Sequence, residues 1–330
     1  MDRVDRKLTK VDRRRPDRDT MEKAASIIKE GGLVAFPTET VYGLGADGMN
    51  PAAVGKIFAA KGRPSDNPLI LHLSSPDGAL GLARLDGRAL AAMRAFWPGP
   101  LTIVLPALSS VPREVTAGLS TVALRMPDHP VALALIEASG CPIAAPSANR
   151  SGRPSPTDAQ AVVSDLGDAV DLVLDAGAVD IGLESTVIDA SGEDVLLLRP
   201  GGTPLEALEE FFGAPIKTPG SGAPEARRSP GTRHRHYAPI VPVRIWTPCD
   251  ALIAATDKSG FVGRLRGGGV PPGFARAICF DSAESYASGL FAAFRALERD
   301  CSEIVAEWPE ADGVGLALRD RIRRAASPDA

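Results

Sequence analysis

Short apolar runs recur along residues 20–212, and each ends at or before a proline, glycine or polar residue, as a buried strand would. They predict strands at 32–36, 69–73, 101–105, 121–125, 143–145, 172–174, 185–189 and 195–199. Helical spacing predicts helices between several of them, at 20–30, 51–60, 87–96, 130–139, 157–166 and 204–212. Because some consecutive strands have no helix between them, parallel and antiparallel pairing must coexist. We therefore expect an α/β domain with a mixed sheet and flanking helices.

The pattern changes on either side of this region. Residues 1–18 mix Asp with Arg and Lys and are almost devoid of apolar residues, which predicts a mobile charged arm before the main domain at 19–212. Residues 213–239 are rich in Pro, Gly, Ser and Arg and predict a linker. In 240–330, apolar runs at 241–246, 260–262, 277–280 and 304–308 alternate with helices, which predicts a smaller α/β domain with a parallel sheet.

Composition narrows the class of protein. A chain of 330 residues exceeds one typical core, in agreement with two domains. Its formal net charge of −4 argues against a broad surface that follows nucleic-acid phosphates. No apolar run approaches the roughly 20 residues of a membrane span, and the charged start has no signal-peptide core. The four cysteines form no C-x-x-C pair, as is typical of reduced thiols. We expect a cytoplasmic protein.

Two polar blocks near the N-terminus, 37–45 and 61–68, predict the two walls of an anion site. The first block follows directly from a strand end. In the second, Lys61 and Arg63 lie two residues apart in a loop that Gly62 and Pro64 bend sharply. Two cations on a stiff turn suit a triphosphate or pyrophosphate better than a single carboxylate.

Further candidates follow later strands. Arg125 and Arg199 each end a strand just before a proline-containing turn. Ligands collect at strand ends in open α/β sheets. The stretch 145–155 contains Ser147 and Asn149 and no acid, and it is read equally well as a site for phosphate or ribose oxygens and as a plain turn.

Several other kinds of site fit the sequence poorly. Gly43, Gly45 and Gly48 have dinucleotide-fingerprint spacing, but polar or bulky residues separate them from the strand end, where that fingerprint needs its glycines. There is no P-loop sequence and no G-x-S-x-G. His234 and His236 lack the further ligands that zinc requires. The phosphates must therefore be held by side chains.

Taken together and in this order, the blocks 37–45, 61–69, 122–127, 145–149, 184–187 and 198–201 resemble the Sua5/YciO/YrdC family. The linker block that includes His236-Tyr-Ala-Pro239, with the domain that follows it, resembles the longer Sua5 form rather than the single-domain YrdC form. This resemblance implies a YrdC-like twisted mixed sheet followed by a smaller Rossmann-like Sua5 domain.

The resemblance also implies an activity. It is that of an L-threonylcarbamoyladenylate synthase, a nucleotidyltransferase that uses L-threonine, bicarbonate and ATP, with Mg²⁺ carried by ATP and no protein metal site, in the first step of the t6A modification of tRNA. Contact with tRNA would be weak or indirect. Both diffusion of the product and its hand-over to the tRNA threonylcarbamoyl transferase machinery stay open, and the alternative function is an RNA-binding or regulatory module without turnover.

By similarity, each site residue receives a role. Threonine would be held by Thr40, His72, Arg125 and Ser185. Catalysis would depend on Lys61, Arg63, Ser147 and Asn149. The nucleotide would be held by Arg63, Asn67, Thr121, Ala145, Ser147, Ser155, Arg199 and Tyr237, with the linker closing over ATP.

Overall fold

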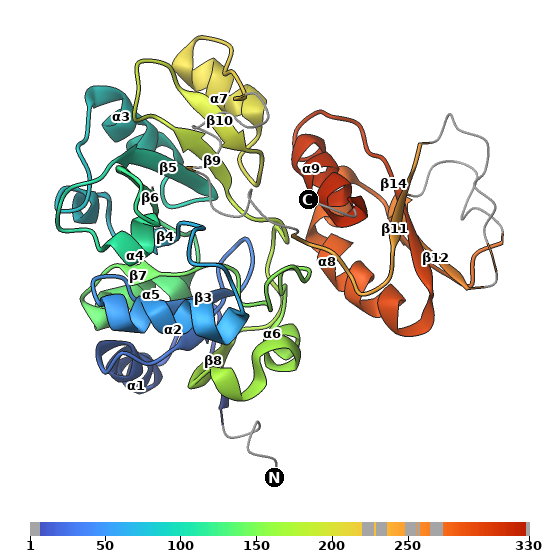
Figure 1. The fold of residues 1–330 in the computed structure, drawn as a ribbon, viewed down its shortest axis with the longest axis horizontal. Coiled ribbons are helices and arrows are strands. Elements are labelled where there is room, and N and C mark those ends of the chain that lie inside the picture. Colours follow the sequence, from blue (N-terminus) through green and yellow to red (C-terminus); the bar gives the residue numbers. More distant parts are fainter. Residues whose placement is uncertain are drawn as a thin grey trace.

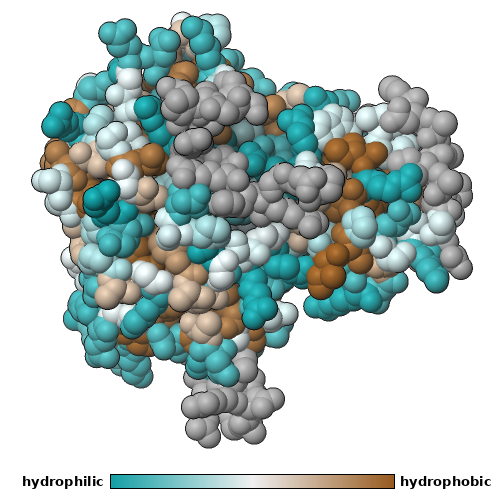
Figure 2. Space-filling view, viewed as in Figure 1, coloured by the Kyte–Doolittle hydropathy of each residue, from teal (hydrophilic) through white to brown (hydrophobic). Residues whose placement is uncertain are grey.

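A computed structural model of the chain describes residues 7–219, 228, 236–247, 256, 258–264 and 273–327. Within these residues the chain forms a larger N-terminal domain and a smaller C-terminal domain, which lie side by side in Figure 1. The predicted combination of a mixed sheet and a second, parallel sheet is confirmed. On the face shown in Figure 2, hydrophilic residues are spread over both domains, with apolar residues gathered over smaller areas.

The N-terminal domain is built on a ten-stranded mixed sheet, in the order β1-β8-β2-β3-β7-β4-β6-β5-β9-β10 among the described residues. Its strands are β1 Leu8–Lys10, β2 Val34–Phe36, β3 Gly43–Asp47, β4 Ile70–His72, β5 Leu101–Pro106, β6 Thr121–Arg125, β7 Ile143–Ala144, β8 Leu172–Asp175, β9 Thr186–Asp189 and β10 Leu196–Arg199. Its helices are α1 Arg18–Lys29, α2 Pro51–Lys61, α3 Gly87–Phe96, α4 Arg113–Thr116, α5 Pro130–Ser139, α6 Ala159–Leu166 and α7 Leu205–Phe212.

Helices cover both faces of this sheet because successive strand residues point to opposite sides. Val34 and Phe36 of β2 pack in one apolar cluster with α1 and α5, whereas Ala35 between them packs in another with α2, α3 and α6. The core therefore lies in two layers, and the strand ends remain available for polar chemistry.

Two strands were not predicted. β3 is rich in glycine and begins inside the first polar block, but it pairs with β2 and β7. β1 falls in the expected mobile arm and pairs in parallel with β8, so that prediction is wrong for Leu8–Lys10. The arm also ends sooner than expected, because the Asp17 side chain caps α1 at the Thr20 amide. The cause in each case is pairing or capping that apolar periodicity does not report.

The C-terminal domain has a parallel sheet in the order β11-β14-β12-β13. Its strands are β11 Val243–Trp246, β12 Ser259–Arg264, β13 Arg276–Phe280 and β14 Glu303–Glu307, and its helices are α8 Ala283–Asp300 and α9 Gly315–Ala326. The two helices lie between this sheet and the N-terminal domain (Figure 1). Val41 and Leu183 of the N-terminal domain and Tyr237 of the linker join the apolar cluster of α8 and α9. Apolar packing thus continues from one domain into the other.

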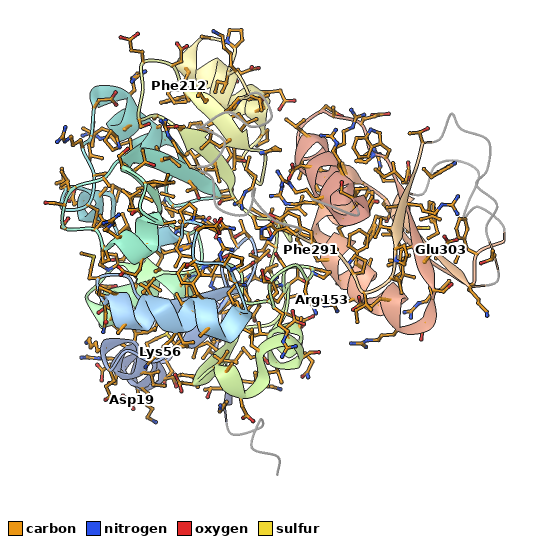
Figure 3. All side chains as sticks on the ribbon, in the orientation of Figure 1. Asp19, Lys56, Arg153, Phe212, Phe291 and Glu303 are labelled. Atoms are coloured by element: carbon orange, nitrogen blue, oxygen red, sulfur yellow. The ribbon has the colours of Figure 1, made fainter. Side chains whose placement is uncertain are left out.

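Much of the predicted linker, at 220–227 and 229–235, lies outside the described residues, and so does the prediction that this stretch closes over ATP. Its first part follows the sheet edge, where Lys217 bridges to Leu196. Its last part brings His236 and Tyr237, which are buried, against the N-terminal domain. Arg153 and Phe291 mark the boundary between the domains in Figure 3.

Candidate functional site

A pocket lies where the ends of several strands meet the last residues of the linker. Its wall comprises Thr38, Thr40, Val41, Gly43, Arg63, Pro68, Leu69, Ile70, His72, Arg125, Ala145, Pro146, Ser147, Glu184, Ser185, Arg199, His236 and Tyr237. All four residues predicted to hold threonine are among them. Both polar blocks contribute, so the structure brings the two predicted walls together.

The predicted threonine residues come together through strand register. β4 and β6 are parallel, and His72 lies opposite Arg125 at their ends. The Nη2 group of Arg125 lies 2.7 Å from Glu39 Oε1 and donates to Thr40 Oγ1 at 3.0 Å. Ser185, just before β9, shares a hydroxyl contact of 2.8 Å with Thr102. A guanidinium has five N–H donors, so Arg125 has capacity for a ligand carboxylate beside these partners.

His72 is held in its neutral form. Burial, and then the nearby Arg125 charge, lowers the pKa of His72 to about 3. Its Nδ1 atom is buried and has no hydrogen-bond partner among the described residues. A neutral imidazole with an unused ring nitrogen in the pocket wall suits a hydroxyl or an amine of a small ligand.

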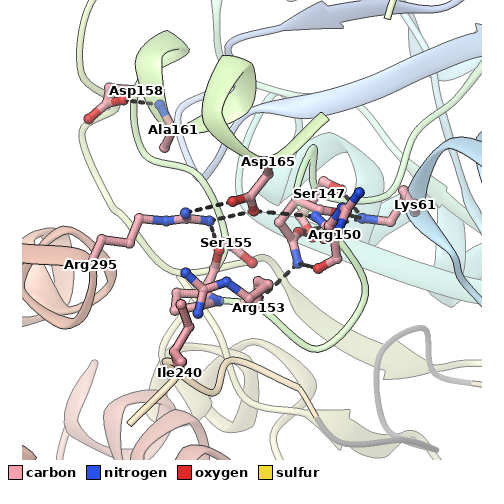
Figure 4. A network of polar contacts seen from close by, with 12 residues as sticks. Lys61, Ser147, Arg150, Arg153, Ser155, Asp158, Ala161, Asp165, Ile240 and Arg295 are labelled. Carbon is pink, nitrogen blue, oxygen red and sulfur yellow. Dashed lines mark hydrogen bonds and ion pairs between the residues drawn. The ribbon is translucent and has the colours of Figure 1, made fainter. Parts of the chain in front are cut away.

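Lys61 lies against the loop that follows β7. Helix α2 ends at Gly62, whose positive φ of 60° is the left-handed cap that turns the chain there. The Nζ atom of Lys61 donates to the carbonyls of Ser147 and Asn149, at 2.5 Å each, and Ser147 Oγ donates to Asn149 Oδ1 at 2.5 Å. Figure 4 shows Lys61 beside this loop. The pair Lys61 and Asn149 therefore shapes the pocket wall without forming part of it.

The predicted nucleotide residues divide into two groups. Arg63, Ala145, Ser147, Arg199 and Tyr237 line the pocket, whereas Asn67, Thr121 and Ser155 do not. The last three are buried next to it or along β6. The Nη2 group of Arg63 donates to the Pro68 carbonyl at 3.2 Å, and Arg199 donates to the Ser185 carbonyl at 2.9 Å.

The site contains several buried cationic side chains whose charged forms are destabilised by their surroundings. Burial lowers the pKa of Lys61 far below its ordinary value, and the Arg63 charge lowers it further. Burial also lowers the pKa of Arg63 to about 10 and lowers that of Arg199. Each cation is destabilised by lost hydration and by a neighbouring cation. A polyanionic ligand would relieve both effects, so the pocket is suited to a triphosphate.

Four residues at or beside the pocket were not predicted as site residues. Glu39, Glu184 and His236 lie in the blocks that carry the family resemblance but received no role in binding or catalysis, and Glu184 accepts from the Ser155 hydroxyl. Arg321 of α9 donates from Nε to Glu184 Oε2 at 2.7 Å. Tyr237 has a positive φ of 67°, a strained conformation for an aromatic residue, in the pocket wall itself. Glu184 could have been found as an acid inside a cationic motif, but Arg321 gives no sequence signal among the arginines of its helix.

The described residues include no group of three or more His, Cys, Asp or Glu side chains placed to hold a metal ion. Among the residues that the structure describes, the pocket wall contains one carboxylate, Glu184, and that one is already bonded to Ser155 and Arg321. These donors do not form a protein cage for Mg²⁺. In the described part of the chain, no helix is both long and apolar enough to cross a membrane.

Comparison with known proteins gives consistent matches over nearly the whole chain. The Sua5/YciO/YrdC family model, described as "Telomere recombination", matches residues 26–201, and a model described as "Threonylcarbamoyl-AMP synthase, C-terminal domain" matches 203–327. Threonylcarbamoyl-AMP synthase of Pyrococcus abyssi is 44% identical over 314 residues, 92% of each chain. That of Bacillus subtilis is 44% identical over 320 residues, again 92% of each. A crystal structure of P. abyssi Sua5 complexed with L-threonine matches with a TM-score of 0.88 and 42% identity, covering 97% of both chains.

Proposed function

This chain belongs to the Sua5/YciO/YrdC family, and on that premise we propose that it is a threonylcarbamoyl-AMP synthase that joins L-threonine, bicarbonate and ATP. The observation that carries the proposal is the single pocket in which Thr40, His72, Arg125 and Ser185 meet buried cations suited to a triphosphate. A relative with 42% identity is described as complexed with L-threonine, which supports that amino acid as the substrate.

The chemistry requires positioning more than a covalent nucleophile. The threonine amine attacks bicarbonate, and loss of water gives a carbamate. A carbamate oxygen then attacks the α-phosphorus of ATP, the bond to the β-phosphate oxygen breaks, and pyrophosphate leaves with the electron pair. The products are threonylcarbamoyl-AMP, pyrophosphate and water. Charge builds up on the phosphoryl oxygens during this transfer, so fixed cations are the main aid that the protein can supply.

Each part of the pocket has a role in this scheme. Arg125 pairs with the threonine carboxylate, while Ser185 and Thr40 contact its polar groups. Arg63 and Arg199, which both line the pocket, face the phosphates. Lys61 fixes the loop of Ser147 and Asn149 by donating to the carbonyls of both residues, and nearby phosphate charge favours its protonated form. Mg²⁺ arrives with ATP as part of the substrate.

The experiment is an assay of pyrophosphate release from Mg-ATP and bicarbonate, with and without L-threonine. Pyrophosphate release should depend on threonine and on bicarbonate. Reactions with serine or glycine in place of threonine are the matched controls. Release that is indifferent to the amino acid overturns the proposal. Duplex-RNA binding without any turnover would favour the regulatory module, which the burial of the pocket cations already disfavours.

Two further parts of the proposal concern the setting. We propose that the protein works in the cytoplasm, where ATP is available and where Cys141, Cys279 and Cys301 stay reduced as the free thiols seen here. Its product, a mixed anhydride of a carbamate and AMP, must be consumed by an acyl-type transfer to a nucleophile on tRNA.

A further inference from the structure

Arg321 belongs to the C-terminal domain but is bonded to the wall of the catalytic pocket. It is fully buried, with no exposed side-chain surface. Its Nε donates to Glu184 Oε2 at 2.7 Å, and its Nη1 donates to the Pro200 carbonyl at 3.1 Å and to Asp320 at 2.6 Å. Its guanidinium also lies 5.0 Å from the centre of the Tyr237 ring. A single side chain therefore contacts an acid, a strand-end carbonyl and an aromatic residue of the predicted nucleotide site.

The ion pair between Arg321 and Glu184 matters because Glu184 lines the pocket. It is the one carboxylate in the pocket wall among the described residues, and a triphosphate must lie nearby. Burial alone would raise the pKa of Glu184, but Arg321 and then Arg199 outweigh it and hold the pKa below its usual value. The carboxylate is therefore ionised, and without a counter-charge it would repel phosphate oxygens. Its other oxygen accepts from Ser155, so its position also sets that hydroxyl.

Tyr237 needs support for a second reason. Its positive φ of 67° is unfavourable for an aromatic residue and persists only where surrounding contacts fix it. Phe291 of α8 stacks on the ring at 5.5 Å, and Arg321 of α9 lies over it. Both supports come from the C-terminal domain, and the ring they hold lines the pocket.

We propose that Arg321 is a positioning residue through which the C-terminal domain completes the nucleotide site, by neutralising Glu184 and fixing Ser155 and Tyr237. This inference rests on the proposed function, because it assumes that the ligand beside Glu184 is a nucleoside triphosphate. Arg321 acts through other residues and leaves the threonine half of the pocket untouched.

The test compares Arg321→Met with Arg295→Met in the full-length chain. Arg295 also forms a largely buried ion pair across the domain boundary, with Asp165 at 2.7 Å (Figure 4), and donates to the Pro154 carbonyl. It is not among the residues that line the pocket. Calorimetry measures binding of α,β-methylene-ATP and, separately, of L-threonine, neither of which requires turnover. Arg321→Met should weaken nucleotide binding by about tenfold or more and change threonine binding by less than about twofold. Arg295→Met should leave both within about twofold.

A double-variant cycle distinguishes charge neutralisation from general damage. If Arg321 acts by neutralising Glu184, then Glu184→Gln should restore part of the nucleotide affinity lost in Arg321→Met. The double variant removes both members of the buried Arg321–Glu184 pair and is therefore expected to fold even if Arg321→Met alone does not. Arg321→Lys, which keeps the charge but not the planar fork, should show an intermediate loss.

Three outcomes overturn the inference: nucleotide binding by Arg321→Met at wild-type strength, an equal loss in Arg295→Met, and strictly additive effects of the Arg321 and Glu184 substitutions. The second would mean that domain docking alone matters. Failure of the proposed function looks different, because wild-type protein would then release no pyrophosphate in a threonine-dependent way whatever the variants bind.

Discussion

At the scale of single residues, two histidines are buried in the neutral form for different purposes. His72 faces the pocket, and burial lowers its pKa to about 3. His129 caps helix α5, where its Nδ1 accepts from the Val131 amide at 3.2 Å, and burial lowers its pKa to about 4. A protonated Nδ1 could no longer accept that bond. Both groups therefore connect the stability of the fold to pH.

The sign of that dependence follows from the direction of the shifts. An unfolded histidine titrates near pH 6.5, above the folded values of about 3 and 4, so acid favours the unfolded chain. The stabilisation is complete above about pH 6.5 and is lost as the pH falls toward 4. His129→Asn keeps a capping acceptor that does not titrate. Its thermal midpoint should fall less than that of wild type between pH 7.5 and pH 5, by the equivalent of about 1–2 kcal/mol. Equal falls in both proteins would refute this reading.

At the scale of elements, the end of helix α2 connects the turn that carries Arg63 with the loop of Ser147 and Asn149. Its last residue, Lys61, fixes the loop at Ser147 and Asn149 through two carbonyls, and Gly62 then turns the chain toward Arg63. The helix end thus sets the position of both the predicted phosphate cation and the loop opposite it. A change confined to Lys61 should loosen the loop while the helix stays intact.

Lys61→Met tests this arrangement against Lys56→Met, a control on the same helix whose Nζ donates instead to the Gly31 carbonyl at 2.6 Å. We expect kcat to fall by about 10- to 100-fold in Lys61→Met, because a misplaced loop misaligns the reacting groups. Amide hydrogen exchange of residues 147–151 should also speed up. Lys56→Met should show neither change. Unaltered exchange together with lost turnover would assign Lys61 a direct role in the chemistry instead.

The elements that sequence predicts well are those with clear signals at their ends. Helix α5 begins at Pro130 and is capped by Gly140, and β5 is a short apolar run that follows Pro100, so their positions were predicted within a residue or two. β3 was missed because its pattern of glycines carries no period, and its place depends on pairing with β2 and β7. The contact between Arg321 and Glu184 spans 137 residues and depends on how two domains dock. No local signal reports a contact of that kind.

At the scale of the whole molecule, the N-terminal domain and the linker line the pocket, and contacts of its wall extend into the C-terminal domain. Tyr237 lines it and also packs in the apolar cluster of α8 and α9, which includes Leu183 of the N-terminal domain. Ion pairs from Arg153 and Arg295 cross the same boundary. Ligand binding should therefore stabilise the two domains together.

Tryptophan fluorescence can follow the domains separately. The chain has three tryptophans, and in a Trp97→Phe variant the remaining two, Trp246 and Trp308, report on the C-terminal domain. Saturating α,β-methylene-ATP should raise the midpoint of their unfolding signal by about 5 °C, because the ligand binds only the folded, docked state. Adenosine, which lacks the phosphates, is the matched ligand and should have little effect. A midpoint that does not change when the nucleotide is added would mean that the C-terminal domain unfolds independently of ligand binding in the pocket.

The separation of Glu184 and Arg321 along the chain also sets an interval during synthesis of the protein. A ribosome adds about 5–20 residues per second, so the 137 residues that separate them take on the order of ten seconds to make. The first domain can fold during that interval, but Glu184 then lacks Arg321 and Tyr237 lacks the support of Phe291 and Arg321. If Arg321 completes the nucleotide site as we propose, the nascent chain passes through a folded stage in which that site is incomplete. Synthesis of the second domain then completes the site.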